Sequence, residues 1–113
     1  MKSNNKKHIK ASITAVGGYL PEDSISNKDL EAMVDTSDEW IRARTGIKKR
    51  RVLNEKGKGT SYLAVNAANN LIARKKIDPT TIDLVIVATI TPDFHCASTA
   101  PSVASAINAI NAY

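Results

Sequence analysis

At 113 residues the chain has the length of one ordinary domain, with 42% hydrophobic and 24% charged residues. No apolar run approaches the roughly 18 residues of a membrane-spanning helix, and no apolar segment follows the basic N-terminus as it would in a secretory signal. The net charge of +5 comes with only 4% aromatic residues, a combination that disfavours nucleic-acid binding. The one cysteine cannot pair within the chain, which favours a reducing, cytoplasmic setting.

The N-terminal part of the chain is predicted to contain an arm, a strand and a short helix. Residues 1–8 are rich in basic side chains and are expected to form a flexible arm. Alternating and β-branched residues predict a strand over 9–16, which the glycine pair 17–18 ends. Ser26 or Asn27 is expected to cap a short helix.

A second helix is predicted within the stretch DTSDEWIRARTGI, residues 35–47. Thr36 and Glu39 have the T-x-x-E spacing of a capping box, in which each side chain accepts from the backbone of the other residue. Gly46 is suited to the left-handed conformation that ends many helices. The helix is therefore expected to start directly after Thr36 and to end near Gly46.

Trp40 and Arg44 lie four residues apart on this helix and therefore share one face. An indole face and a guanidinium plane together can grip a flat aromatic ligand. The alternative is that the single tryptophan only anchors a core, which is its more usual role. The residues alone leave both interpretations open.

The rest of the chain alternates predicted strands and helices. Residues 47–53 indicate a short basic strand or an extended edge, and Thr60 is expected to cap a longer helix that ends near Lys76. The continuous apolar run 84–88 has the composition of a parallel strand that is buried on both faces. A further helix, rich in small residues, begins near Thr99.

This alternation predicts an α/β layered fold. A buried parallel strand needs neighbours on both edges, yet only two good strands, one doubtful strand and a further one beginning at residues 112–113 are found. Because these are too few to close a doubly covered sheet, the chain is interpreted as a fragment or as the N-terminal piece of a larger enzyme.

The sequence resembles β-ketoacyl-[acyl-carrier-protein] synthase III, the initiating condensing enzyme of type II fatty acid synthesis. The matching stretches are GGYLP (17–21), NKDLEAMVDTSDEWIRARTGIKKRR (27–51), IDLVIVATITPDF (82–94) and STAPSVASAI (98–107). The resemblance implies a thiolase-like fold with layers α/β/α, incomplete here, in which residues 9–113 form part of the N-terminal domain. It also implies a homodimer at full length.

The resemblance implies that Thr36, Trp40 and Arg44 bind the adenine of coenzyme A, whose thioester is a substrate and not a permanently bound cofactor. Stacking on one aromatic ring contributes roughly 1–3 kcal/mol, whereas a micromolar affinity requires about −8 kcal/mol. Other contacts must therefore complete the site. Basic surface near the pocket is expected to meet coenzyme A phosphates and an acidic acyl carrier protein.

The catalytic residues of such enzymes, a cysteine, a histidine and an asparagine, have no counterpart among these 113 residues. The nucleophilic cysteine is expected just beyond Tyr113, so the chain alone is predicted to be inactive. Cys96 next to His95 is not interpreted as a catalytic pair, because adjacent side chains do not share a face. His95 has no second ligand at a useful spacing, so no metal site is expected.

The resemblance gives the loop at 94–97 another role. In this family it crosses the dimer and contacts the acyl pocket of the partner subunit. Its residues here are Phe94, His95, Cys96 and Ala97. Related sequences often carry an aromatic residue where Cys96 stands, so the smaller side chain is expected to leave room for a longer or branched primer.

Three alternatives remain open at this point. The first is a specialised relative that makes polyketide-like or long-chain products. The second is a non-catalytic truncated product, either unfolded or acting as an interaction module. The third is a nucleic-acid binder that uses the basic cluster 48–51, which the lack of interleaved aromatic residues disfavours.

Overall fold

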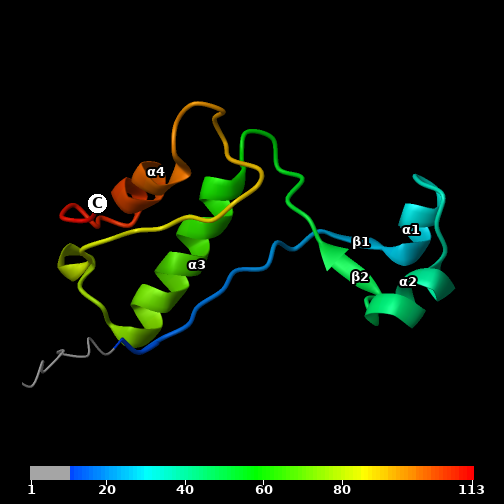
Figure 1. Ribbon diagram of the computed structural model, residues 1–113, viewed down its shortest axis with the longest axis horizontal. Helices are drawn as coiled ribbons and strands as arrows, with labels where there is room; N and C mark the ends of the chain where they lie inside the picture. The colour runs from blue at the N-terminus through cyan, green and yellow to red at the C-terminus, as the bar shows by residue number, and fades with distance from the viewer. Residues whose placement is uncertain (1–10) are drawn as a thin grey trace, which may run out of the picture.

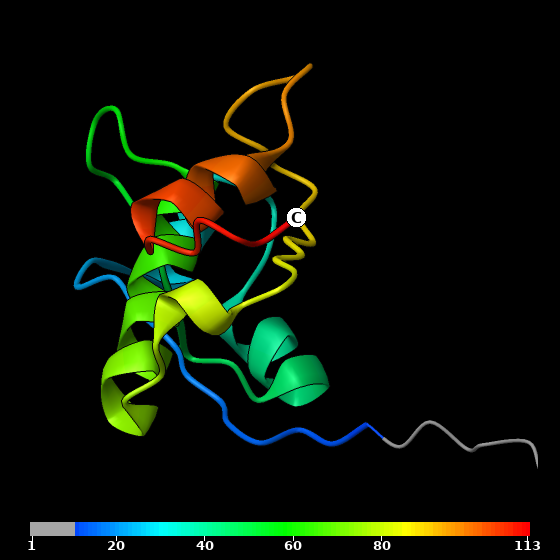
Figure 2. The ribbon, with the colours of Figure 1, turned by 90° about the vertical axis from the view of Figure 1, so that its left-hand side faces the viewer.

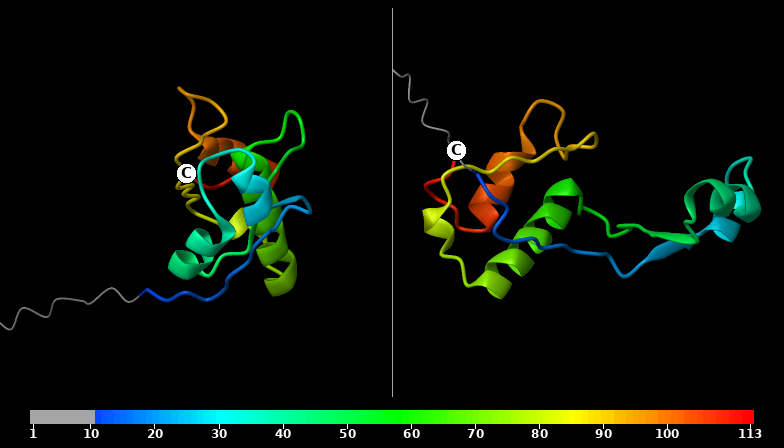
Figure 3. Two further views of the ribbon diagram at one scale, coloured as in Figure 1. Left: turned by 90° about the vertical axis from the view of Figure 1, so that its right-hand side faces the viewer. Right: turned by 60° about the horizontal axis from the view of Figure 1, so that its bottom comes forward.

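The computed structural model describes residues 11–113, and its helices and strands form two separate groups (Figure 1). The first group contains β1 (Ser24–Ser26), α1 (Asn27–Glu31), α2 (Asp38–Thr45) and β2 (Lys49–Arg51), and the second contains α3 (Thr60–Lys75), the 3-10 helix η1 (Pro79–Thr81) and α4 (Thr99–Ala106). Two extended segments, 11–23 and 52–59, run between the groups (Figure 3, right). The shape is accordingly elongated, with extents of 67 × 40 × 32 Å. The predicted arm, residues 1–8, lies outside the described residues.

The first group is a small unit built on the antiparallel pair of β1 and β2, in which Ile25 lies opposite Arg50. Ser26 and Asp29 form a reciprocal capping box at the start of α1: the Ser26 hydroxyl accepts from the Asp29 amide, and the Asp29 carboxylate accepts from the Ser26 amide. Among the described residues of this group, Ile41 is its buried apolar side chain, at 8% exposure. So little apolar burial means that polar contacts carry much of the unit's stability.

The second group holds the main hydrophobic core, where α4 packs on α3 (Figure 2). Its buried members are Val103, Ala104, Ile107 and Ala109. Half-buried side chains from the inner stripe of α3 and from the extended segment 82–87 pack against them. The predicted bounds of α3 and the predicted start of α4 are confirmed to within one residue.

The apolar run 84–88 was predicted to be a strand buried on both faces, and this prediction is wrong in part. The run is extended but is covered on one face only. Val85 and Val87 pack toward the core, whereas Leu84 and Ile86 are 58% and 79% exposed. The Val85 amide donates to the Tyr113 carbonyl at 2.9 Å, and the Tyr113 amide donates to the Asp83 carbonyl at 3.0 Å. This is the hydrogen-bond pattern of a parallel pair, and Figure 2 shows the end of the chain beside the yellow segment.

The strand predicted over 9–16 is not present in its described part, residues 11–16. The segment is extended and Ile13 is 89% exposed. An isolated β-branched run has no ladder partner here, and a strand needs one to form. The layered α/β prediction is therefore confirmed only in part: within residues 11–113 the structure shows mixed helices and a small antiparallel sheet of two strands.

The extended segment 11–23 crosses α3 so closely that Gly17 has no room for a side chain. An added Cβ would lie 2.7 Å from the Leu71 Cβ and 3.0 Å from the Ala67 carbonyl oxygen. We expect Gly17→Ala to destabilise the chain by about 1–3 kcal/mol, as other overpacking changes do. Gly18→Ala is the matched control, since nothing lies within 4 Å of its added Cβ. Urea unfolding of the two variants checks this, and equal midpoints would contradict it.

Candidate functional site

Helix α2 presents the predicted clamp residues at the outer end of the first group. Ser37 caps this helix, and its hydroxyl accepts from the Trp40 amide at 3.1 Å. The predicted capping box of Thr36 with Glu39 is thus wrong by one residue. The predicted end is confirmed, since Gly46 has φ +70° and its amide donates to the Arg42 carbonyl.

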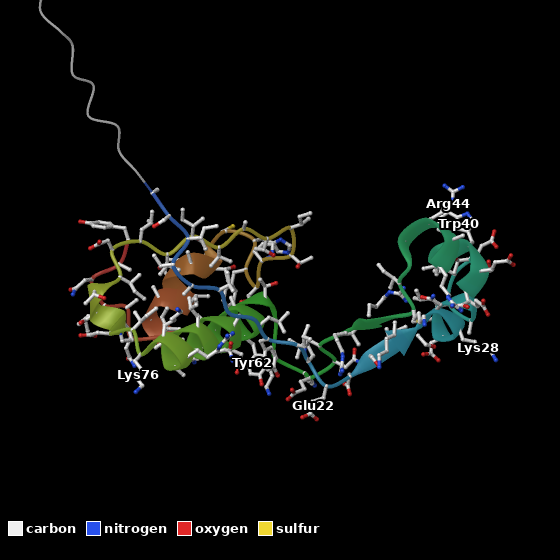
Figure 4. All side chains as sticks on the ribbon, turned by 90° about the horizontal axis from the view of Figure 1, so that it is seen from below. Glu22, Lys28, Trp40, Arg44, Tyr62 and Lys76 are labelled. Carbon is white, nitrogen blue, oxygen red and sulfur yellow. The ribbon has the colours of Figure 1, made fainter. Side chains whose placement is uncertain are left out.

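Trp40 and Arg44 lie against each other, with the guanidinium carbon 4.8 Å from the centre of the indole ring. Figure 4 shows both side chains projecting from the tip of the molecule. Trp40 is 54% exposed, so within this chain it does not serve as a core anchor. Thr36 is not the cap residue, and it lines one surface hollow together with Asp35, Ser37 and Trp40.

A purine does not fit between the two side chains as they stand. Each stacked layer needs about 3.5 Å, so a ring between two planes requires a separation of roughly 7 Å. The observed 4.8 Å is a direct cation–π contact. An adenine ring can enter only if Arg44 swings away from Trp40, with the indole face then exposed to the ligand.

A polar cluster around the buried Asn27 fixes α2 against the rest of the first group. Asn27 is only 1% exposed, and its amide nitrogen donates to the Asp38 carboxylate and to the Ile47 carbonyl, each at 2.7 Å. Its amide oxygen accepts from the Arg50 guanidinium at 2.8 Å. One side chain therefore connects the start of α1, the start of α2 and the strand β2, and it sets the position of the helix that carries Trp40.

The basic cluster 48–51 is partly structural. Arg50 bonds to Asn27, and Arg51 donates to the carbonyls of Pro21 and Glu22 at 3.1 and 2.6 Å. Lys48 and Lys49 are exposed. Half of the cluster is thus engaged within the fold, and its two lysines face solvent.

Hydrogen bonding to the charged form lowers the pKa of Asp38 below its ordinary value, first through the Asn27 amide and then through Arg42. A carboxyl whose pKa falls on folding stabilises the native state above about pH 4, and this contribution disappears as the pH falls through the lowered value.

We therefore expect the first group to lose stability below about pH 4, and Asp38→Asn to weaken this acid dependence while its oxygen still accepts from Asn27. Fluorescence of Trp40, the only tryptophan, reports on this group directly. Denaturant midpoints measured from neutral to acid pH check the expectation. An unchanged pH profile in Asp38→Asn would contradict it.

The other predicted site, the loop at 94–97, belongs to the second group and lies away from the clamp (Figure 1). All four residues are exposed, with Phe94 at 62% and Cys96 as a free thiol. Within residues 11–113 no group of three metal-binding side chains occurs, and no helix is long and apolar enough to cross a membrane.

No local sequence pattern identifies the residues that hold the site together. From its position at the start of a helix, Asn27 is as well suited to be a helix cap as to be a buried residue. Its burial depends on Asp38 and Arg50, which are 11 and 23 residues away. A polar residue that three separate segments surround cannot be distinguished from a solvated one by local pattern alone.

No protein-family model matches the chain. It is similar to the β-ketoacyl-[acyl-carrier-protein] synthase III of Porphyromonas gingivalis, with 60% identity over 99 residues, and these cover 88% of this chain and 30% of the relative. The crystal structure of synthase III from Thermus thermophilus matches with a TM-score of 0.77 and 44% identity, covering 91% of this chain and 32% of that one.

A further solved structure is the priming β-ketosynthase of the R1128 polyketide pathway, with a TM-score of 0.78 and 34% identity, covering 88% of this chain and 29% of that one. The chain thus spans about 30% of the length of the curated relatives it matches. Together these matches give it a partial thiolase-like fold of the synthase III type.

Proposed function

This chain is a homologue of β-ketoacyl-[acyl-carrier-protein] synthase III, and on that premise we propose that it forms the coenzyme A-binding side of such a condensing enzyme. The observation that carries the proposal is the exposed pair Trp40 and Arg44 beside Thr36, on a helix that the polar cluster around Asn27 fixes in place. A solvent-exposed indole with a guanidinium on its face suits a nucleotide base.

The reaction of the complete enzyme would start with acyl transfer from coenzyme A to a cysteine sulfur, which releases the coenzyme A thiol. Decarboxylation of malonyl-carrier protein would then supply the carbanion that attacks the acyl-enzyme, with loss of carbon dioxide and return of the cysteine. The clamp residues would hold the nucleotide end of the acyl donor during the first step. The exposed Lys48 and Lys49 would attract the acidic carrier protein.

A hybrid synthase tests this function. In it, the matching 99 residues of this chain replace those of the Porphyromonas gingivalis enzyme. We expect the hybrid to condense acetyl-coenzyme A with malonyl-carrier protein, and we expect the 113-residue chain alone to do so at no measurable rate. A hybrid that folds by circular dichroism but shows no condensation would contradict the proposal.

The second candidate is a specialised synthase that primes polyketide or long-chain synthesis, and the match to the R1128 priming ketosynthase favours keeping it. Primer preference distinguishes the two. We expect Cys96→Phe in the hybrid to reduce the use of longer or branched acyl primers relative to acetyl, since the aromatic ring fills the space that the thiol leaves. An unchanged preference would contradict the role given to Cys96.

A further inference from the structure

The first turn of α3 lacks a side-chain cap of its own. Thr60 was expected to cap the helix, but Gly59 occupies the cap position and makes no side-chain hydrogen bond. The first amides of a helix have no partner within it, and a carboxylate is favoured there by the helix dipole. An acceptor must therefore come from elsewhere.

Asp93 supplies that acceptor from a loop more than thirty residues further along. Its carboxylate accepts from the Ser61 amide at 2.9 Å and is half-buried. Hydrogen bonds from the first turn of α3 lower its pKa, that from Ser61 being the largest effect. The Thr60 hydroxyl also donates to the carbonyl of Thr91, which lies two residues before Asp93. The loop is therefore joined to the start of α3 at two points.

Gly59 and Asp93 fit each other closely. A Cβ at position 59 would lie 2.2 Å from the Asp93 carboxylate oxygen. Gly59 has φ −141°, so ordinary residues could adopt its backbone conformation. A side chain at position 59 would instead displace the Asp93 carboxylate, because the carboxylate occupies the space where that side chain would project.

The loop at 94–97 is therefore held at both ends by helix caps. Asp93 precedes it and caps α3, while Ser98 follows it and caps α4 through the Ala100 amide at 3.3 Å. The two helices pack on each other through the main core. Only four exposed residues remain between two fixed points, and their reach is limited accordingly.

We propose that Asp93 is a positioning residue that sets the primer-selecting loop by fastening its start to the first turn of α3. This inference rests on the proposed synthase III function. Loss of the fastening would let Phe94 and Cys96 move relative to the acyl pocket, so that discrimination between acyl chains of different length would weaken.

The test uses the hybrid synthase and compares kcat/KM for acetyl-coenzyme A with that for a longer, branched acyl-coenzyme A. We expect Asp93→Ala to change this ratio by about tenfold, the low end of what one methylene group discriminates in an apolar pocket. Asp93→Asn keeps an acceptor for the Ser61 amide and should restore most of the ratio. Gly59→Ala should act like Asp93→Ala because it displaces the carboxylate.

Asp78→Ala is the matched control, since Asp78 caps η1 through the Thr80 amide at 3.0 Å. It should lower stability without altering the ratio. If unmodified hybrid is inactive, the proposed function itself fails. If the hybrid is active and Asp93→Ala leaves the ratio unchanged, or if Asp78→Ala changes it equally, the positioning role is overturned.

Discussion

Replacing Trp40 by alanine in the hybrid synthase is expected to raise KM for acetyl-coenzyme A by roughly 5- to 150-fold, with little change in kcat. The range follows from the roughly 1–3 kcal/mol that one aromatic ring contributes by stacking on a base. Because the adenine is remote from the reacting thioester, the lost contact is equal in the ground state and the transition state, and such a loss appears in KM. Steady-state kinetics with varied acetyl-coenzyme A measure this effect.

Two conservative variants sharpen the result. Trp40→Phe keeps a ring and should lose less affinity than Trp40→Ala. Arg44→Lys keeps the charge but not the guanidinium plane, so it should still weaken binding. If KM is the same for Trp40→Ala and the unmodified hybrid, the indole does not contact the nucleotide.

Replacing Asn27 by alanine is expected to have the largest effect on folding of any single change in the first group. It would remove a side chain that is 1% exposed and leave the Asp38 carboxylate, the Ile47 carbonyl and the Arg50 guanidinium without their partner. One Arg50 nitrogen is already buried without a hydrogen bond. Water can reach the Asp38 carboxylate, since that side chain is 43% exposed. The penalty of about 1–3 kcal/mol for an unpaired buried group therefore applies to only part of this set, and we expect a loss of about 2–4 kcal/mol.

Denaturant unfolding followed by Trp40 fluorescence measures this loss, because the only tryptophan lies in the same group. Asn70→Ala is the control, since Asn70 is exposed on α3 and surface changes of this kind usually stay within about 0.5 kcal/mol. Similar midpoints for Asn27→Ala and Asn70→Ala would show that the cluster does not hold α2 in place.

Local signals predicted the helices well. The left-handed conformation of Gly46 and the extent of α3 follow from residue preferences over a few positions, and both were predicted correctly. The cap of α2 was predicted at Thr36, whereas the structure places it at Ser37. Both hydroxyls satisfy the same residue preference, and only the hydrogen bond from the Trp40 amide distinguishes them.

Features that depend on distant partners could not be predicted in this way. The run 84–88 reads as a doubly buried strand, yet within residues 11–113 it has only Tyr113 as a ladder neighbour and one covered face. Asn27 and Asp93 act through segments 11 to 32 residues away. Their neighbours along the chain carry no sign of those contacts.

The predicted pair of Trp40 and Arg44 was identified from helical spacing, and the structure adds the geometry of their contact. The helical spacing of Trp40 and Arg44 placed them together, and the structure confirms that they touch. It also shows that the pair is closed, which spacing alone could not reveal. A purine that binds between these two side chains would therefore exchange a cation–π contact within the protein for stacking on the ligand.

The most direct test follows the fluorine signal of fluorotryptophan at position 40 in the hybrid synthase, assigned by its absence in Trp40→Phe. Adding coenzyme A, or its adenosine bisphosphate half alone, is predicted to shift the signal in a saturable way, because Arg44 leaves the indole and a purine takes its place. Pantetheine, which lacks the adenine, should leave it unmoved. A signal that responds equally to pantetheine, or to none of the three at saturating concentrations, would contradict a nucleotide clamp at Trp40 and Arg44.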